Sequence, residues 1–350
     1  MGLQTQVCVF AFSLFLLRTS AWAVEDPPTF ILQWGSNGTA DGQLSGPHGI
    51  EVDADGIVYV ADTGNNRIQK FTGNGVFLTQ WGSFGAGLGQ FNHPHGIGIG
   101  TTGDVFVAET GNNRVQRFTN QGTFVTTWGS FGDGNGQFRH THDLTIDADG
   151  NVFVVDRDQT RVQKFTSNGT FITVWGSFGT GDGQFTAPNG VAVDAAGNVF
   201  VSDTSDRIQK FTNNGVFMRA WGSTGTGDGQ FDFPRSLSTD GIGNLYVADR
   251  DNQRMQKFTG DGVFLTKWGS FATGSGQFNF PYTLQADPNA SVVYVADSRN
   301  HRVQKFRVAT GGVPAASEWG LAIMAFLLLS AGTVLLPATF LLGESATSLR

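Results

Sequence analysis

A short motif that occurs six times constrains this chain more than any other feature of its sequence. The copies start 46 to 48 residues apart, at Val58, Val105, Val152, Val199, Leu245 and Val293. Each copy is an alternating apolar run that ends in Asp or Glu, then a Gly/Asn/Asp-rich turn, then a second alternating run that opens with Arg. This pattern is typical of a β-hairpin, and no copy shows a period of 3.6 residues. We therefore predict an all-β fold, a β-propeller with six blades.

The number of strands predicts how the ring closes. A run that ends in Trp follows every hairpin except the last one, whereas an additional run of this kind, residues 30–34, precedes the first hairpin. If the N-terminal run completes the last blade, each blade has four strands and no inner sheet edge is left unpaired. We expect a propeller domain over residues 30–308, closed by pairing of residues 30–34 with residues 302–306, and we expect it to be monomeric.

Composition limits the class of protein. The 49 glycines follow the repeat rather than a Gly-X-Y pattern, and the 31 phenylalanines supply a core, so collagen and disorder are both excluded. The formal net charge of −7 argues against a protein that binds nucleic acid through overall positive charge. The single cysteine, Cys8, lies in a segment that we expect to be removed, so we expect no disulfide and no cofactor held by cysteine.

Both ends of the chain differ from the repeats. Residues 1–23 have an apolar stretch followed by Ser20-Ala-Trp-Ala23, which predicts a secretory signal peptide. Residues 309–318 form a linker, and residues 319–342 contain no ionisable side chain. Because about 20 apolar residues span a bilayer, residues 319–342 are predicted to form a transmembrane helix.

Two resemblances to known families rest on these motifs. The pattern Gly-Gln-Phe-x-x-Pro-x-Gly, followed by Val-Tyr-Val-Ala-Asp-x-x-Asn-x-Arg-Ile-Gln-Lys-Phe, resembles the NHL repeat, which implies a six-bladed propeller. The C-terminal segment resembles the IPTL-CTERM sorting tail of Gram-negative bacteria. That second resemblance implies anchoring in a bacterial envelope membrane, or at the cell surface after C-terminal sorting, and rests on Pro314, Ser317, Glu318, Trp319 and Gly320.

An acid and an arginine flank the turn of every hairpin. Six copies of one acid would make an unusual catalytic set, so we interpret them as structural ion pairs with bidentate carboxylate–guanidinium geometry. The pairs are Asp62/Arg67, Glu109/Arg114, Asp156/Arg161, Asp203/Arg207, Asp249/Arg254 and Asp297/Arg302. Three residues after each arginine stands another cation, which we expect to be solvated rather than part of a phosphate-binding rim; these are Lys70, Arg117, Lys164, Lys210, Lys257 and Lys305.

The position before each innermost strand differs from blade to blade, whereas the framework positions repeat. In a propeller this position faces the mouth of the central channel, so its six side chains are expected to ring one solvent-exposed funnel that binds a ligand. No catalytic residue is assigned. The six residues are His48, His95, His142, Asn189, Arg235 and Tyr282.

Three imidazoles in this ring also suggest a metal. His48, His95 and His142 lie on neighbouring blades and three nitrogens suit zinc with one open position. The NHL resemblance implies the same alternative, because peptidyl-α-hydroxyglycine lyases use this propeller with a histidine-bound zinc in the channel. Capping of backbone groups by these histidines is the competing interpretation, and His93, His140 and His301 are off this register and expected at the surface. Gly-Asp loops such as residues 132–137 lack the full calcium ligand series and are interpreted as turns.

The sequence favours an exported, membrane-tethered propeller that binds a protein or glycan at one face of the ring and is not an enzyme. A metal-dependent lyase with a histidine-lined channel is the alternative. A third hypothesis, a nucleic-acid-binding NHL domain, conflicts with the net charge and with the predicted export signal.

Overall fold

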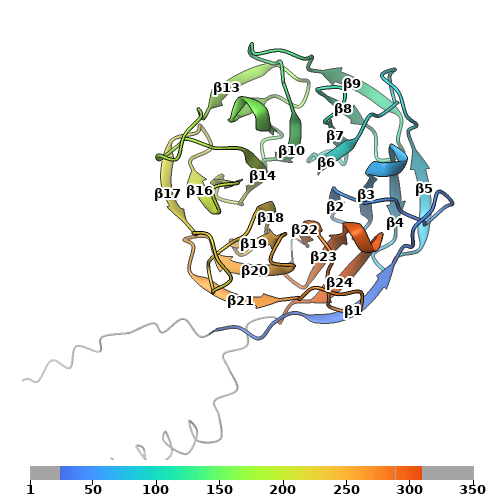
Figure 1. Ribbon diagram of the computed structural model, residues 1–350. Coiled ribbons are helices and arrows are strands. Elements are labelled where there is room, and N and C mark those ends of the chain that lie inside the picture. The colour runs from blue at the N-terminus through green and yellow to red at the C-terminus, as the bar shows by residue number, and fades with distance from the viewer. Residues whose placement is uncertain (1–23, 288, 310–350) are drawn as a thin grey trace, which may run out of the picture. The chain divides into compact units, whose positions relative to one another are not determined.

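The computed structural model describes residues 24–287 and 289–309, which form a ring of six four-stranded antiparallel sheets around a central channel (Figure 1). The all-β, six-bladed propeller predicted from the repeats is therefore confirmed. The predicted signal peptide, sorting motif and transmembrane helix fall outside the described residues. Within residues 24–287 and 289–309, no helix is long and apolar enough to cross a membrane.

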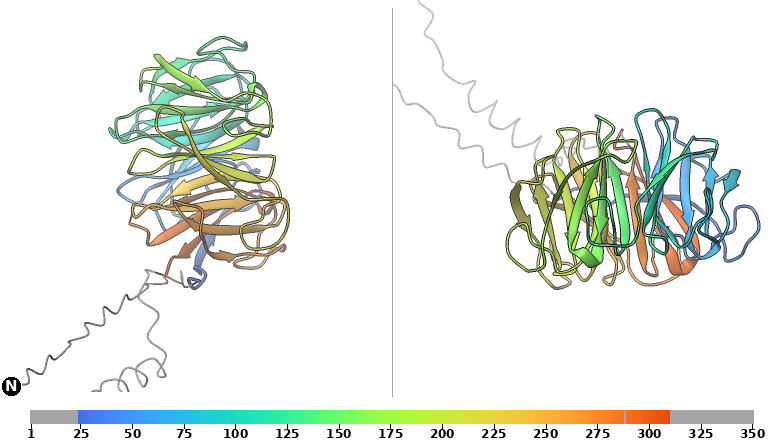
Figure 2. Two further views of the ribbon diagram at one scale, coloured as in Figure 1. Left: turned by 90° about the vertical axis from the view of Figure 1, so that its left-hand side faces the viewer. Right: turned by 90° about the horizontal axis from the view of Figure 1, so that it is seen from above.

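Each blade runs from an innermost to an outermost strand in chain order, except that the last blade takes its outer strand from the N-terminal end (Figures 1 and 2). Blades 1 to 3 contain β2 (Ile50–Val52), β3 (Val58–Asp62), β4 (Arg67–Phe71) and β5 (Phe77–Trp81); β6 (Pro94–Ile99), β7 (Val105–Glu109), β8 (Arg114–Phe118) and β9 (Phe124–Trp128); and β10 (Thr141–Ile146), β11 (Val152–Asp156), β12 (Arg161–Phe165) and β13 (Phe171–Trp175). Blades 4 to 6 contain β14 (Pro188–Val193), β15 (Val199–Asp203), β16 (Arg207–Phe211) and β17 (Phe217–Trp221); β18 (Pro234–Thr239), β19 (Asn244–Asp249), β20 (Arg254–Thr259) and β21 (Phe264–Trp268); and β22 (Pro281–Ala286), β23 (Val292–Asp297), β24 (Arg302–Arg307) and β1 (Thr29–Trp34). Short 3-10 turns join three of the hairpins, η1 (Thr63–Asn65), η2 (Arg157–Gln159) and η3 (Ser298–Asn300).

The ring closes as the strand count predicts. Strand β1 pairs antiparallel with β24, with Phe30 opposite Phe306 and Trp34 opposite Val303. The N-terminal strand therefore supplies the outer strand of blade 6, and every blade in the described residues has four strands. Closure leaves no blade with an incomplete sheet, which removes an edge that another chain could pair with.

The apolar core lies between adjacent blades. Each cluster joins the face of one blade to the facing side of the next, as where Trp81 of blade 1 packs on Phe118 of blade 2 with ring centroids 6.0 Å apart. The sixth cluster joins Tyr294 and Val303 of blade 6 to Leu44 and Phe71 of blade 1. Because alternate residues of each inner hairpin point to opposite neighbours, one repeated pattern builds the whole core.

Each outer tryptophan also fixes the next blade. Trp81 lies against Gly122 in the turn between β8 and β9, where a Cβ atom would meet the indole at 2.7 Å. Gly122 has a φ of +84°, so both the contact and the backbone conformation require glycine there. The Trp and Gly repeats are therefore two halves of one contact between neighbouring blades.

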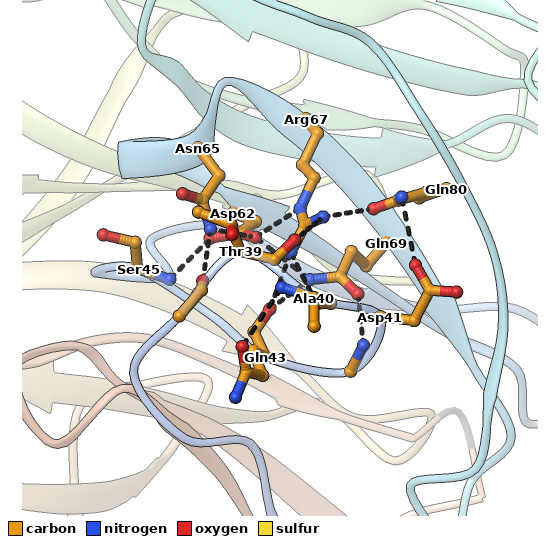
Figure 3. A network of polar contacts seen from close by, with 12 residues as sticks. Thr39, Ala40, Asp41, Gln43, Ser45, Asp62, Asn65, Arg67, Gln69 and Gln80 are labelled. Carbon is orange, nitrogen blue, oxygen red and sulfur yellow. Dashed lines mark hydrogen bonds and ion pairs between the residues drawn. The ribbon is translucent and has the colours of Figure 1, made fainter.

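The acid–arginine ion pairs form in every hairpin, but they are not bidentate. Arg67 donates Nε–H to Asp62 Oδ2 at 2.7 Å, while its two terminal nitrogens donate to the carbonyls of Thr39, Ala40 and Gln43 (Figure 3). The guanidinium therefore connects the Gly-rich loop to the hairpin. The acid–arginine pattern in the sequence does not indicate these loop carbonyls as partners. Buried Gln69 completes the network by donating to Asp62 Oδ2 at 3.0 Å.

Five of the six pairs share this geometry and blade 4 departs from it. The nitrogen–oxygen distances are 2.6 to 3.0 Å in the other blades but 3.6 Å between Arg207 Nε and Asp203. Asp203 and Arg207 are four residues apart rather than five, so the turn is shorter and Arg207 Nε is left without a hydrogen bond. Asp203 accepts hydrogen bonds from Thr186, Ala187 and Ser205 instead.

The repeated cations contact neighbouring segments, and three of the six are buried. Lys164, Lys210 and Lys257 are at most 7% exposed, which contradicts the expectation from sequence. In five blades the cation reaches a group at the edge of the next blade, as Lys70 Nζ does with the carbonyl of Asn120 at 3.0 Å and Lys305 Nζ with that of Gly73 at 2.8 Å. Lys257 of blade 5 instead pairs with Glu25 of the segment that precedes β1. The Lys70 ammonium group also lies over an aromatic ring of its own blade, with Nζ 5.0 Å from the centroid of Tyr59. No basic rim for phosphate exists at these positions.

Candidate binding site at the channel mouth

One face of the propeller carries the start of every innermost strand, the hairpin turns and the Gly-rich loops. The backbone places them together, since His48 N–H donates to the carbonyl of Ala61 just before the hairpin turn, and Arg67 holds the loop at Thr39. We call this surface the mouth face. Strand β1 begins and strand β24 ends at the opposite face, because Thr29 is paired with Arg307.

The six predicted site residues meet around the channel axis in a closed circle, which we call the channel ring. His48 stacks on Tyr282 with ring centroids 3.6 Å apart, and the rings of His48 and His95 are 4.6 Å apart. His95 and His142 follow at 4.2 Å. The circle is completed by a hydrogen bond of His142 Nδ1 with the carbonyl of Asn189 at 2.6 Å, a hydrogen bond from Arg235 to Asn189 Oδ1 at 3.3 Å, and the stacking of Arg235 on Tyr282 at 3.9 Å.

The channel ring fills the channel instead of lining an open funnel. Asn189, His142, Arg235 and His95 are 0, 3, 6 and 8% exposed, so the expectation that Arg235 lies at a solvent-exposed mouth was wrong. The physical reason is the close approach of the inner strands: a Cβ atom on Gly49 would lie 2.2 Å from the carbonyl oxygen of His95. Side chains as large as imidazole and guanidinium then contact one another across the axis, as His95 Nε2 and Tyr282 Oη do at 3.2 Å.

The histidines of the channel ring are neutral near pH 7. Burial, followed by the charge of Arg235, lowers the pKa of His48 to about 3. Burial is also the largest cause that lowers the pKa of His95 and of His142 well below its ordinary value. These imidazoles therefore serve as hydrogen-bonding and stacking groups.

The ring histidines do not form a metal centre in this arrangement. His48 stacks on Tyr282 and meets His95 edge-on, the rings of His95 and His142 are tilted against each other, and His142 uses Nδ1 for the hydrogen bond with Asn189. Among residues 24–287 and 289–309, no group of three His, Cys, Asp or Glu side chains is placed to bind one metal ion. A zinc site needs three or four such donors aimed at one centre.

Arg235 is a buried cation without a counter-ion among the described residues. Its guanidinium makes one hydrogen bond, to the neutral amide of Asn189, and its Nε is buried without any partner. No carboxylate of the described residues lies within ion-pair distance of it. Burial, and then the charges of Arg250 and Arg157, lower the pKa of Arg235, although a guanidinium stays protonated near pH 7.

A cavity of about 260 Å³ opens above the channel ring at the mouth face. Beyond the ring residues, it is lined by side chains that the ring register does not predict, namely Thr63, His93, Thr110, His140, Arg157, Phe233 and Arg250. His93 is exposed, as expected, whereas His140 is 27% exposed and packs 5.5 Å from His142. His301 lies away from this cavity and accepts a hydrogen bond from Gly46 N–H at 3.0 Å.

Aromatic and guanidinium groups alternate along one side of the mouth. Arg250 lies 3.9 Å from the ring of Phe233 and 5.3 Å from that of Phe280, and Arg299 lies 3.6 Å from the ring of Phe280. We call these four residues the arginine–phenylalanine ladder. Arg250 is paired with Asp251 at 2.7 Å, whereas Arg299 is exposed and forms no ion pair among the described residues. For the two phenylalanines a sequence signal was present, because Phe233 and Phe280 stand directly before the proline of their repeats, where Gly46 and Ala187 stand in blades 1 and 4.

The backbone at these positions is strained. His93, Phe233 and Phe280 adopt φ values of +53°, +58° and +53°, which bulky side chains rarely take. A strained conformation of this kind persists where the surrounding contacts hold it, and such residues cluster at functional sites. The strained residues therefore lie at the same rim of the mouth as the arginine–phenylalanine ladder.

A second cavity, of about 180 Å³, lies below the channel ring and is lined by both apolar and polar residues of the innermost strands. It contains two carboxyl groups that sequence reasoning missed, Glu51 of blade 1 and Asp143 of blade 3. Burial is the main cause that raises the pKa of Glu51 to about 8 and that of Asp143 to about 7. At the far end the channel widens to about 600 Å³ beside Asp53, Asp147 and Asp240, whose carboxylates accept backbone N–H groups and close turns.

Four phenylalanines stand out from the Gly-rich loops of the mouth face. Phe84, Phe131, Phe178 and Phe271 occupy one repeat position and are 67 to 76% exposed. The loops themselves are turns, as predicted: in residues 132–137 the Gln137 side chain accepts a hydrogen bond from Gly134 N–H at 3.0 Å. Exposed apolar residues that gather on one face are typical of interaction surfaces.

Comparison with known proteins agrees with this architecture. The NHL repeat matches residues 44–71, 91–118 and 278–306. The E3 ubiquitin-protein ligases TRIM71 of Bos taurus and Gallus gallus are each 50% identical over 46 residues, which is 13% of this chain. The chain spans only 5% of the length of these curated relatives.

Solved structures share the fold at low sequence identity. A protein of unknown function from Bacteroides thetaiotaomicron superposes with a TM-score of 0.62 at 16% identity over 79% of this chain and 76% of the other. A gluconolactonase from Xanthomonas campestris gives 0.58 at 14% identity over 81% and 98%, and virginiamycin B lyase from Staphylococcus aureus 0.54 at 15% over 76% and 96%. The described residues therefore form a six-bladed β-propeller. This propeller carries NHL repeats.

Proposed function

We propose that this protein is an exported, membrane-tethered binding module that receives a protein or glycan ligand at the mouth face. The observation that carries the proposal is the channel ring. Framework positions such as the outer tryptophan repeat in every blade, whereas the ring combines imidazole, amide, guanidinium and phenol groups. A framework position meets the same packing demands in all six blades and therefore repeats, whereas a ligand-binding position can differ between blades.

The surroundings of the ring support docking at this face. Polar donors line the mouth cavity, strained residues form its rim, and exposed phenylalanines stand on the surrounding loops. Aromatic residues and arginines dominate the energetics of protein interfaces. Strand β1 begins and strand β24 ends at the face opposite the mouth.

The alternative functions have weaker support. The lyase hypothesis needs a metal, and the ring histidines pack against one another and form a hydrogen bond with Asn189 instead of aiming at one centre. Structural likeness to a lyase and a gluconolactonase at 14 to 15% identity concerns the fold alone. Nucleic-acid binding is opposed by the net charge of −7, and the repeated lysines are engaged between blades.

Screening the purified full chain against a peptide library and a glycan array tests the proposal. The affinity of the ligands found there is then measured for two double variants, each of which removes two positive charges. R157A/R250A alters the mouth, whereas R219A/K267A removes two exposed cations from the outer strands, with side chains 49 and 44% exposed. We expect the mouth variant to bind at least tenfold more weakly and the control to bind within twofold of the native protein. Equal binding by all three proteins would refute the mouth face as the docking surface.

A further inference from the structure

We infer that the group received at the mouth is a carboxylate of a peptide, and that Arg235 in the channel ring is the residue that binds it. This inference rests on the proposed function and specifies its ligand. It comes from the combination of a buried unpaired cation, a cavity that reaches it, and a flanking ladder of further arginines.

The first observation is the missing counter-ion. Removing a cation from water is costly unless an anion and hydrogen-bond acceptors replace the solvent. Arg235 is 6% exposed, yet its only hydrogen-bond acceptor among the described residues is the Asn189 side chain, and its Nε has none. Every arginine of the hairpin network, by contrast, is surrounded by loop carbonyls and faces an acid. A bound carboxylate would supply the acceptors and the charge that Arg235 lacks.

The charges around Arg235 leave a positive balance. Arg157 lies near Asp158, with nitrogen and oxygen 3.8 Å apart, and Arg250 is paired with Asp251. The three ring histidines are neutral, because burial lowers the pKa of each. Asp143 approaches from the lower cavity, but burial raises its pKa to about 7, so it holds a proton for much of the time near neutral pH. The charge of Arg235 therefore remains largely uncompensated, and the cavity of about 260 Å³ gives an anion access to it.

The arrangement of the aromatic groups favours a peptide over a sugar. Sugar rings dock on open aromatic faces, but Phe233 is covered by Arg250, Phe280 by Arg299, and Tyr282 by both His48 and Arg235. The ligand instead meets the edges of guanidinium groups, which carry the N–H donors that match a carboxylate. Stacking on aromatic rings fixes the guanidinium planes. Asp251 accepts from Nε and one terminal nitrogen of Arg250, whereas Arg299 forms no ion pair in the described part of the chain.

Four small probes separate the possible ligands. N-acetylglycine carries the carboxylate of a peptide end, and N-acetylglycinamide is its neutral counterpart. Galacturonate carries the same charge on a sugar, and inorganic phosphate represents a different anion. Binding to the purified full chain is measured by calorimetry at constant ionic strength and pH 7. We expect the affinity to follow the order N-acetylglycine, galacturonate, phosphate, with no heat from N-acetylglycinamide.

Variants then locate the site. R235Q is expected to weaken N-acetylglycine binding at least tenfold and R299Q by a smaller factor, while R219Q on the outer strand leaves it unchanged. If R235Q fails to fold, the comparison of N-acetylglycine with N-acetylglycinamide on the native protein still decides the matter. Equal binding of these two probes, or tighter binding of galacturonate or phosphate, would overturn the inference. Amidated peptides that bind the mouth as well as free acids would also overturn it while leaving the proposed function intact.

Discussion

Replacing Asp62 by Asn tests how the hairpin network holds each blade. The carboxylate accepts four N–H groups, from Ser45 at 2.7 Å, Asn65 at 2.9 Å, Arg67 at 2.7 Å and Gln69 at 3.0 Å. Three of them point at Oδ2, so an amide in either orientation turns its NH₂ toward at least one donor and leaves Arg67 without its counter-charge. Removing one partner of a buried pair costs about 3–5 kcal/mol.

Asp203 is the matched control within the same molecule. The Asp203 carboxylate accepts hydrogen bonds only from neutral donors, and Arg207 Nε lies 3.6 Å from it. We therefore expect Asp203→Asn to cost only about 1–3 kcal/mol, because the lost hydrogen bonds are not charge-assisted on the donor side. At roughly 2–4 °C per kcal/mol for a domain of this size, Asp62→Asn lowers the Tm by about 10 °C and Asp203→Asn by about half as much. Thermal unfolding followed by circular dichroism measures both. If the two variants are equally stable, or Asp203→Asn is the less stable one, the role assigned to the Arg67 Nε contact is refuted.

Three further predictions test other parts of the fold. Deleting residues 24–35 removes β1, exposes the edge of β24 and is expected to lower the Tm and promote aggregation; an unchanged Tm would contradict closure by this strand. Lys164→Met is expected to destabilise the propeller, because it leaves the acceptor Asn213 unpaired at the boundary of blades 3 and 4, whereas Lys267→Met on an exposed side chain should be neutral in the same denaturation assay. Glu51→Gln tests the lower cavity through pH: the folded pKa of about 8 lies above the unfolded value, so Glu51 ionisation destabilises the folded state increasingly from about pH 4.5 to pH 8. The variant should therefore gain Tm relative to the native protein at pH 8.5 but not at pH 4, and parallel profiles would refute the assignment.

Much of the fold can be predicted from the sequence because each repeat contains the alternating runs and turn residues that define its strands. The alternating runs, the turn residues and the Trp-ended strands predict blade number, strand number and ring closure, and the antiparallel pairing of β1 with β24 agrees with the prediction. The strand pattern depends on contacts within one repeat, and ring closure follows from the number of strands.

The errors concern contacts that the repeat does not encode locally. The lysines were expected in solvent, but Lys70 reaches the carbonyl of Asn120, which belongs to the next blade. The arginines were expected to bind carboxylates with two nitrogens, but the loop preceding each hairpin folds back and takes the terminal nitrogens. The sequence gives no direct measure of how close the blades and loops come in space.

The sequence predicts which six residues meet at the channel axis, but it does not predict that their side chains fill the channel. All six ring positions converge on the axis, as their register implies, yet the radius of the ring decides whether they line a funnel or fill it. Arg157, Arg250, Phe233 and Phe280 come from hairpin turns and loop ends outside that register. Only the packing of blades 3 to 6 brings them to the same mouth.

The central claim is that the mouth face receives an anionic ligand above Arg235. Crystals of the protein grown with 4-bromobenzoate test it directly, because the anomalous signal of bromine locates a bound carboxylate ligand without prior assumptions. We predict a bromine peak in the mouth cavity, with the carboxylate within hydrogen-bond distance of Arg235. A bromine peak only in the lower channel or on the outer surface of the blades would contradict the account.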